Sequence, residues 1–142
     1  MAKFAEGTEV PAERSRAEIE RTLTRFGADQ FGYGWRESAS VIVFRAQGRH
    51  IRFILPMPTE ADLKGMRIKD AREREIRRRW RALTLCIKAK LEAVATGIES
   101  FEESFMAHIV LPDGRTLAEA TLPQIAQAYK DGKMPALLGF EK

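Results

Sequence analysis

A stretch of alternating aromatic and β-branched residues, from position 31 to position 55, constrains the fold more than any other feature of this sequence. A period of two is typical of β-strands. Glycine and polar residues divide the stretch into three runs, at about 31–36, 39–46 and 49–55. Gln47-Gly48 fits a two-residue hairpin turn between the last two runs. The sequence therefore predicts a three-stranded antiparallel meander.

The two-residue turn also predicts the register of the last two strands, because it pairs Ala46 with Arg49. In this register four apolar side chains share one face, which we expect to be the core face: Ile42, Phe44, Ile51 and Phe53. The opposite face then carries Arg45, His50 and Arg52 close together. Like charges in such positions repel each other unless acidic groups cover them.

Helices are predicted before and after the meander in the sequence. The first begins either at Pro11 or at the capping-box pattern of Ser15 and ends at Gly27. A long helix runs from about 68 to 96, where Gly97 ends it. Its apolar stripe steps by three and four residues, as expected for a helix packed on the sheet: Ile76, Trp80, Leu83, Ile87, Leu91 and Val94.

Shorter helices are predicted after the long one. Capping boxes begin at Ser100 and Thr116, and Pro123 is expected to end the second of these helices or to begin another. The apolar tail around Leu137, Leu138 and Phe140 is expected to lie in a groove of its own domain or of a partner. We predict an α+β fold, with residues 1–10 as a mobile N-terminal lead-in and residues 11–142 as a single domain.

Composition narrows the function classes. The chain has 142 residues, one cysteine and two histidines, which leaves no internal disulfide and too few ligands for a Cys/His zinc site. No apolar run is long enough to span a membrane, and no apolar segment of the secretory kind follows the N-terminus. We therefore expect a cytoplasmic protein without a metal or other cofactor and without a membrane partner.

The positive charge of the chain is concentrated in residues 67–81. This segment contains eight basic residues and three acidic ones, whereas the whole chain has a net charge of only +4. At 100° per residue, four arginines lie on the side opposite the apolar stripe: Arg74, Arg77, Arg78 and Arg81. The planar guanidinium group binds phosphate in bidentate fashion and stacks on bases.

Three interpretations of this arginine face remain open. In the first, it binds nucleic acid, DNA or RNA, without sequence specificity, and Arg45 and Arg52 extend the track of phosphate contacts. In the second, it binds an acidic protein surface, as in an inhibitor of a host defence complex or a small homo-oligomer. In the third, the charges are simply solvated and stabilised by pairs such as Glu73–Arg77 and Glu75–Arg79.

The aromatic residues Phe31, Tyr33 and Trp35 point to one side of the first strand. They either stack unpaired bases beside the arginines or belong to the core. Catalysis has little support in the sequence: we expect Cys86 to be a buried core residue and His50 and His108 to be structural. The acidic pairs at 102–103 and at 60 and 62 match no metal-site pattern, so we do not expect an enzyme.

Three segments support a resemblance to a known family: residues 13–20 with 31–35, residues 79–83 with 87–94, and residues 107–116. The chain resembles, from about residue 10 to residue 138, a family of small uncharacterised proteins of tailed bacteriophages and prophages. This resemblance implies a bacterial host cytoplasm during infection. Accessory proteins of phages commonly handle DNA or disable host defences, so the resemblance is compatible with both the nucleic-acid and the protein-interaction hypothesis.

Overall fold

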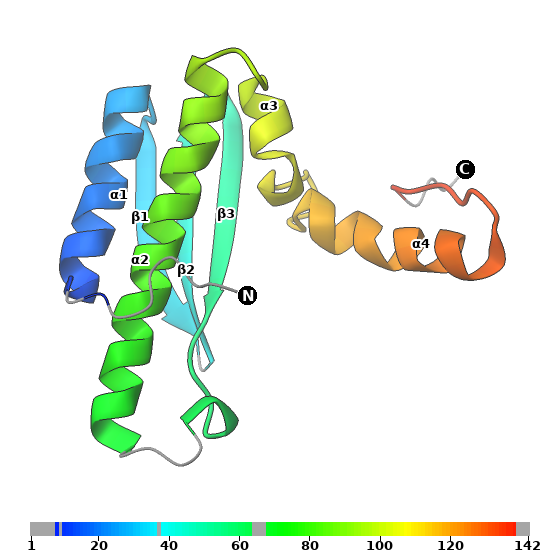
Figure 1. The fold of residues 1–142 in the computed structure, drawn as a ribbon. Coiled ribbons are helices and arrows are strands. Elements are labelled where there is room, and N and C mark those ends of the chain that lie inside the picture. Colours follow the sequence, from blue (N-terminus) through cyan, green and yellow to red (C-terminus); the bar gives the residue numbers. More distant parts are fainter. Residues whose placement is uncertain (1–7, 9, 37, 64–67, 139–142) are drawn as a thin grey trace.

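The computed structural model describes residue 8 and residues 10–36, 38–63 and 68–138, so the predicted lead-in lies almost entirely outside the described residues. The elements follow the predicted α+β order (Figure 1). They are α1 (Ala12–Phe26), β1 (Gln30–Arg36), β2 (Ala39–Ala46), β3 (Arg49–Pro56), η1 (Ala61–Leu63), α2 (Ile68–Ala95), α3 (Phe101–Ser104), η2 (Met106–His108) and α4 (Leu117–Asp131).

The three strands form an antiparallel sheet in the order β1-β2-β3, and the predicted register is confirmed. Ala46 pairs with Arg49, Phe44 with Ile51 and Ile42 with Phe53. Gln47 and Gly48 both adopt positive φ angles, 49° and 75°, as a type I′ hairpin turn requires. The right-handed twist of the flanking strands favours this turn, so the local sequence is sufficient to fix the pairing.

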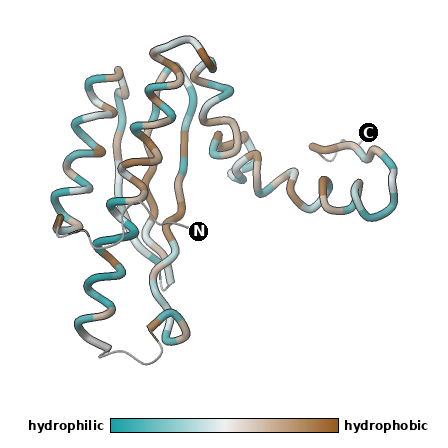
Figure 2. The backbone as a smooth tube through the Cα atoms, in the orientation of Figure 1, coloured by the Kyte–Doolittle hydropathy of each residue, from teal (hydrophilic) through white to brown (hydrophobic). Residues whose placement is uncertain are grey.

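Helices α1 and α2 cover one face of the sheet and lie side by side (Figure 1). The predicted stripe of α2 faces the core: Trp80, Leu83, Ile87 and Leu91 are buried, while Ile76 and Val94 pack against the same cluster. Figure 2 shows that the N-terminal half of α2 is mainly hydrophilic and that apolar residues concentrate where the helix crosses the sheet. Burial of this stripe holds the long helix on the sheet.

The start of α1 lies at Pro11, the first of the two predicted points. Pro11 is the N-cap residue, and no side chain caps the helix. The capping-box alternative at Ser15 is wrong, because Ser15 lies inside the helix, is fully buried and has a hydroxyl group without a hydrogen-bond partner. Gly27 ends the helix at φ 115°, in the left-handed conformation that glycine accommodates without strain.

The second face of the sheet remains largely exposed. Val43 and Ile54 are 41% and 39% exposed there, although both are large apolar residues. Acidic groups pair with the arginines of this face and reduce the repulsion between their positive charges. Arg45 forms an ion pair with Asp29, and Arg52 donates to Glu119 at 2.8 Å and to the Gly114 carbonyl at 2.9 Å.

The C-terminal part begins with the predicted capping box, in which Ser100 and Glu103 cap each other's backbone at the start of α3. Ile109 then forms an isolated bridge with Ile51 at the edge of β3. Helix α4 extends away from the sheet, and its main contact is with η2 (Figure 1).

Within the described segments, no helix combines the length and the apolarity needed to cross a bilayer.

The prediction for Pro123 is wrong, because α4 continues through it as one helix. Proline removes only one backbone hydrogen bond, and Pro123 lies on the exposed surface of α4. The apolar tail is not buried in the domain over its described part: Met134 is 85% and Leu138 51% exposed, while Phe140 lies outside the described residues.

Candidate nucleic-acid interface

Arg78 is one of the four arginines predicted on the outer face of α2, and it is only partly available to solvent. Its guanidinium group forms a bidentate contact with Glu75, with a distance of 2.8 Å from Nε to the carboxylate, and only 21% of its side chain is exposed. Arg79 shares the same carboxylate at 3.0 Å. The pKa of Glu75 is lowered, first by the Arg78 hydrogen bond, so the carboxylate stays ionised and neutralises part of this face.

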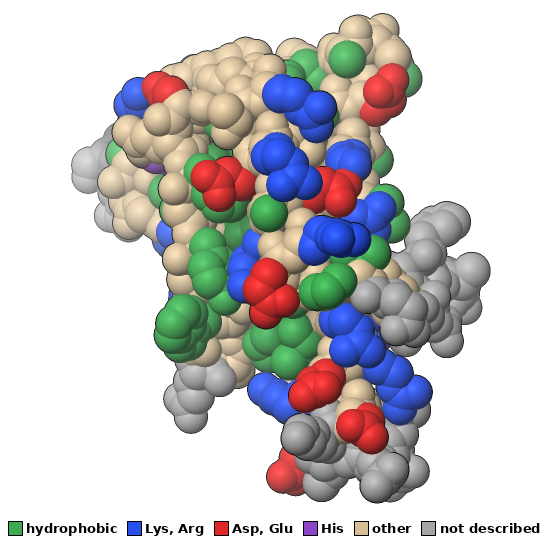
Figure 3. All heavy atoms as spheres, turned by 90° about the vertical axis from the view of Figure 1, so that its left-hand side faces the viewer, with side chains coloured by type: hydrophobic (Ala, Val, Ile, Leu, Met, Phe, Trp, Pro, Cys, Tyr) green, Lys and Arg blue, Asp and Glu red, His purple; other side chains and the backbone are tan. Residues whose placement is uncertain are grey.

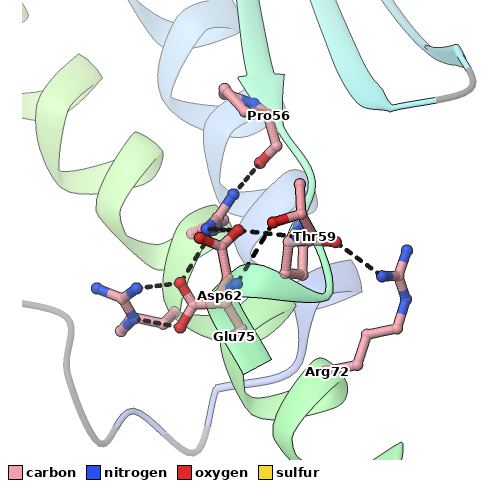
Figure 4. A network of polar contacts seen from close by, with 8 residues as sticks. Pro56, Thr59, Asp62, Arg72 and Glu75 are labelled. Carbon is pink, nitrogen blue, oxygen red and sulfur yellow. Dashed lines mark hydrogen bonds and ion pairs between the residues drawn. The ribbon is translucent and has the colours of Figure 1, made fainter. Parts of the chain in front are cut away.

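Two arginines that flank the apolar stripe serve the fold. Arg79 donates to the Pro56 carbonyl at 2.7 Å and to Asp62 at 3.0 Å, and Arg72 donates to the Pro58 carbonyl at 2.9 Å. Figure 4 shows how these contacts join α2 to the segment that follows β3. Because that segment ends the sheet with prolines, it has few backbone donors of its own. Arg72 and Arg79 are therefore structural anchors rather than free cations.

Arg81 and Lys88 meet a carboxylate from α1. Arg81 donates to Glu18 at 2.9 Å, and Lys88 forms an ion pair with the other oxygen of the same group. These contacts lower the pKa of Glu18, the Lys88 hydrogen bond most strongly. Lys88 remains 43% exposed and Arg81 24%. One carboxylate thus serves two cations, which leaves an excess of positive charge between the two helices.

Arg74 and Arg77 differ in environment. Arg74 is exposed and, among the residues that the structure describes, forms no hydrogen bond or ion pair. Arg77 is half-buried, and its Nε is buried without a hydrogen-bond partner. It lines an open pocket of about 470 Å³ together with Pro11, Ala12, Glu13, Glu73 and Ile76. The expected Glu73–Arg77 ion pair is not formed, whereas the expected Glu75–Arg79 pair is present.

The structure adds three arginines of α1 that the sequence interpretation missed. Arg14, Arg21 and Arg25 lie on the same helical stripe as Glu18, at i, i+4, i+7 and i+11, so they lie on the side of α1 that borders α2. All three are exposed, and none has a partner within the described chain. Their spacing was visible in the sequence. The sequence did not show that this row of arginines lies beside a second basic row, because that depends on which helix packs beside α1.

We refer to these cations together as the basic seam. It consists of Arg14, Arg21 and Arg25 from α1 and of Arg74, Arg78, Arg81 and Lys88 from α2. The members from α2 also share one stripe, and Glu18 joins the two rows through Arg81 and Lys88. Figure 3 shows Lys and Arg side chains along this side of the molecule, with Asp and Glu side chains interspersed among them. From Arg74 to Lys88 the seam extends roughly 21 Å along α2.

Arg45 and Arg52 do not extend the basic seam. The register places both on the exposed face of the sheet, opposite the face that α1 and α2 cover. Both already hold carboxylates, Asp29 and Glu119 respectively. The sheet therefore separates the two basic surfaces, and one nucleic-acid segment lying along the helices does not reach the two strand arginines.

The aromatic residues of β1 divide between core and surface. Phe31 packs against the buried core, whereas Tyr33 is 41% and Trp35 77% exposed. The guanidinium carbon of Arg16 lies 4.5 Å from the centre of the Tyr33 ring. The core hypothesis is confirmed for Phe31. Tyr33 and Trp35 instead form an exposed pair with ring centres 6.2 Å apart, and for them base stacking stays a prediction.

The side chains considered as catalytic candidates either make contacts that support the fold or lie exposed. The prediction that Cys86 is buried is wrong: it is exposed, because it precedes Ile87 by one residue and is rotated by about 100° from the buried stripe. His108 stacks on Phe53 with ring centres 4.0 Å apart. Glu102 pairs with Arg49, and Glu103 caps α3. Over the described ranges, no three His, Cys, Asp or Glu side chains come together as a possible metal site.

Comparisons with protein-family models, with curated proteins and with solved structures find no match to this chain.

Proposed function

We propose that this protein binds nucleic acid without sequence specificity through the basic seam. The observation that supports this proposal most directly is the set of four exposed arginines without partners, Arg14, Arg21, Arg25 and Arg74, on two adjacent helices. An exposed guanidinium group without a carboxylate beside it is free to bind phosphate at no cost in internal ion pairs. In this proposal the arginines contact phosphates of the backbone, which carry no sequence information, rather than base edges.

The resemblance to proteins of bacteriophages agrees with this proposal. In such a setting the protein acts in the cytoplasm of the bacterial host, where the nucleic acids of phage and host are both accessible. We do not include Arg45 and Arg52 in the proposed surface, because they lie beyond the sheet. No catalytic step is part of the proposal.

The test is a fluorescence-anisotropy titration with labelled single- and double-stranded DNA and RNA. If the basic seam neutralises about four phosphates, raising salt from about 50 to about 200 mM weakens binding by about 50-fold for single strands and about 150-fold for duplexes. The test variant replaces Arg14, Arg21, Arg25 and Arg74 by Gln. Because these side chains are exposed and unpartnered, the fold stays intact while the affinity at low salt falls at least about tenfold.

A matched variant separates the position of the charges from their number. It replaces four exposed cations outside the basic seam by Gln: Arg49, Arg115, Lys130 and Lys133. Both variants lose the same formal charge, so equal losses of affinity would refute the seam as the binding surface. Absence of binding by the parent protein to every probe at about 50 mM salt would refute the proposed function itself.

A protein-interaction module is the second candidate function, and helix α4 favours it. Leu122 is 59% exposed, Ile125 38% and Tyr129 89%, and they fall on one side of the helix at i, i+3 and i+7. Such a stripe normally packs against another element, yet α4 extends from the domain with its main contact at η2. Its partner in this hypothesis is either a second copy of the chain or a host protein.

Sedimentation velocity at about 1 to 100 μM tests the first of these partners. If α4 joins two copies, the parent protein associates, and replacing Leu122, Ile125 and Tyr129 by Gln makes it monomeric. The control variant replaces Gln127 and Asp131 by Ala, because both are exposed on the side of α4 opposite the apolar stripe, and it retains the association. A parent protein that stays monomeric at about 100 μM would refute the homo-oligomer.

A further inference from the structure

We propose that Trp35, supported by Tyr33 and Arg16, is a stacking site for an unpaired nucleobase, so that the protein prefers single-stranded over double-stranded nucleic acid. This inference rests on the proposed function and specifies its substrate class. Trp35 is the penultimate residue of β1, which is an edge strand of the sheet. Its ring is 77% exposed, an unusual position for a residue that contributes so much apolar area when buried.

The exposed ring is attached to a rigid support. Tyr33 lies 6.2 Å from Trp35 on the same face of β1 and contacts the buried Trp80 edge-on at 5.6 Å. Trp80 is only 1% exposed and belongs to the central core. The row Trp80, Tyr33, Trp35 therefore leads from the core to the surface, and the outermost ring is held by packed neighbours rather than by a loop.

Arg16 supplies the second component of a base-stacking site. Its guanidinium carbon lies 4.5 Å from the centre of Tyr33 and 5.2 Å from that of Trp80, which fixes the side chain over the two rings. It has no carboxylate partner within the described chain, and so its charge is free to attract a phosphate. Aromatic rings beside such cations stack bases of any sequence.

The stacking site and the basic seam lie on opposite sides of α1. Arg16 is rotated by about 140° to 180° from Arg14, Arg21 and Arg25 around the helix axis. Figure 3 shows hydrophobic side chains next to Lys and Arg on this side of the molecule. A flexible single strand bound to the arginines of α1 therefore has to cross over this helix to place one or two bases on the exposed rings at the edge of β1. A base inside a duplex has no free face to offer, which accounts for the expected preference.

The two tryptophans of the chain make a direct test possible. Trp35 is exposed and Trp80 is buried, so a base that stacks on Trp35 quenches only the exposed part of the emission. We expect quenching of the parent protein by a single-stranded oligonucleotide of mixed sequence and none by the duplex of the same sequence. In the Trp35→Phe variant only Trp80 emits, and the quenching disappears while most of the binding remains.

Anisotropy titrations give the corresponding affinities. Trp35→Ala weakens binding of the single strand by about 5- to 150-fold and leaves binding of the duplex within about twofold. Ile98→Ala serves as the control for loss of surface apolar area, because Ile98 is 78% exposed and lies in the turn that follows α2. Binding of single strands without quenching, with equal affinity in parent and Trp35→Ala, would overturn the stacking site and leave the basic seam standing. Failure of all probes to bind would overturn both.

Discussion

At the scale of single residues, the same residue type has different roles according to its partners. Arg79 donates to a backbone carbonyl and to two carboxylates, whereas Arg74, five residues earlier on the same helix, is exposed without a partner in the described chain. Ion pairs between exposed groups contribute only about 0 to 1 kcal/mol, but the side chain of Arg79 is only 20% exposed and also holds a backbone carbonyl, so it remains a structural anchor. Arg74, in contrast, has no contact within the described chain that a ligand would have to break.

His108 gives a prediction at this scale. Burial against Phe53 lowers the pKa of His108 below its ordinary value of 6.5, and the charge of Lys90 acts in the same direction, while a hydrogen bond donated by the imidazole to the Arg52 backbone opposes both. The unfolded chain therefore binds a proton more readily than the folded one in the range below 6.5. The free energy of unfolding should fall as the pH decreases from about 7.5 to about 5.5.

Urea unfolding at both pH values measures this effect. His108→Phe keeps an aromatic ring on Phe53 and removes the titrating group, so the part of the pH dependence that His108 contributes should vanish. His50→Gln, at an exposed position of β3, should leave the contribution of His108 to the pH dependence unchanged. An identical pH dependence in the parent and in His108→Phe would assign the effect to other groups.

At the scale of elements, α1 and α2 are joined by apolar contacts toward the sheet and by a charged contact toward solvent. Ile19 and Leu23 of α1 are buried in the same cluster as Trp80 and Leu83 of α2. On the outer side Glu18 accepts hydrogen bonds from Arg81 and Lys88. The carboxylate reduces the repulsion between cations from two helices, which allows the basic seam to exist in a stable fold.

Glu18→Gln tests that stabilising role. The pKa of Glu18 lies below its ordinary value of 4.5, mainly because of Lys88 and then of Arg81, so its ionised form contributes stability above that value and loses it as the pH falls through the lowered pKa. We expect Glu18→Gln to reduce the free energy of unfolding by about 1 kcal/mol at neutral pH and by much less at about pH 3.

Denaturant unfolding of parent and variant at the two pH values provides the measurement. Glu20→Gln is the matched control, because Glu20 is exposed two residues away and its carboxylate has no partner in the described chain. If Glu18→Gln lowered the free energy of unfolding equally at neutral and acidic pH, the variant would act through packing rather than through charge.

At the scale of the whole molecule, the chain consists of a packed unit of α1, α2, α3 and the sheet, with α4 extending from it (Figure 1). The base of α4 is attached firmly: Thr116 and Ala120 are buried, and Glu119 holds Arg52. Beyond that first turn the helix has little contact with the packed unit. Its apolar stripe therefore adds almost nothing to the stability of the isolated chain.

A chain shortened after Thr121 tests this organisation. It keeps the anchored turn of α4 and removes Leu122, Ile125, Tyr129 and the tail. We expect cooperative unfolding with a free energy within about 1 kcal/mol of the parent value, measured by urea denaturation followed by circular dichroism. A loss of more than about 3 kcal/mol would mean that the distal part of α4 belongs to the folding unit.

The sequence alone determined the features that depend on short-range spacing. Alternation and the Gln47-Gly48 turn fixed the strand register, and three- and four-residue steps fixed the buried stripe of α2, because backbone geometry sets both periods. Local rules failed where packing overrides them. Ser15 lies inside α1 rather than at its start, Cys86 is exposed beside the stripe, and Pro123 is accommodated on the exposed side of α4.

How these elements meet depends on contacts between residues far apart in the sequence. The contact of Arg81 with Glu18 joins residues 63 positions apart, and no local pattern predicts it. The same packing brings the arginines of α1 beside those of α2, while it places Arg45 and Arg52 beyond the sheet. Which face of a sheet a helix covers depends on the total apolar area that it buries, and that is a property of the whole chain rather than of any segment.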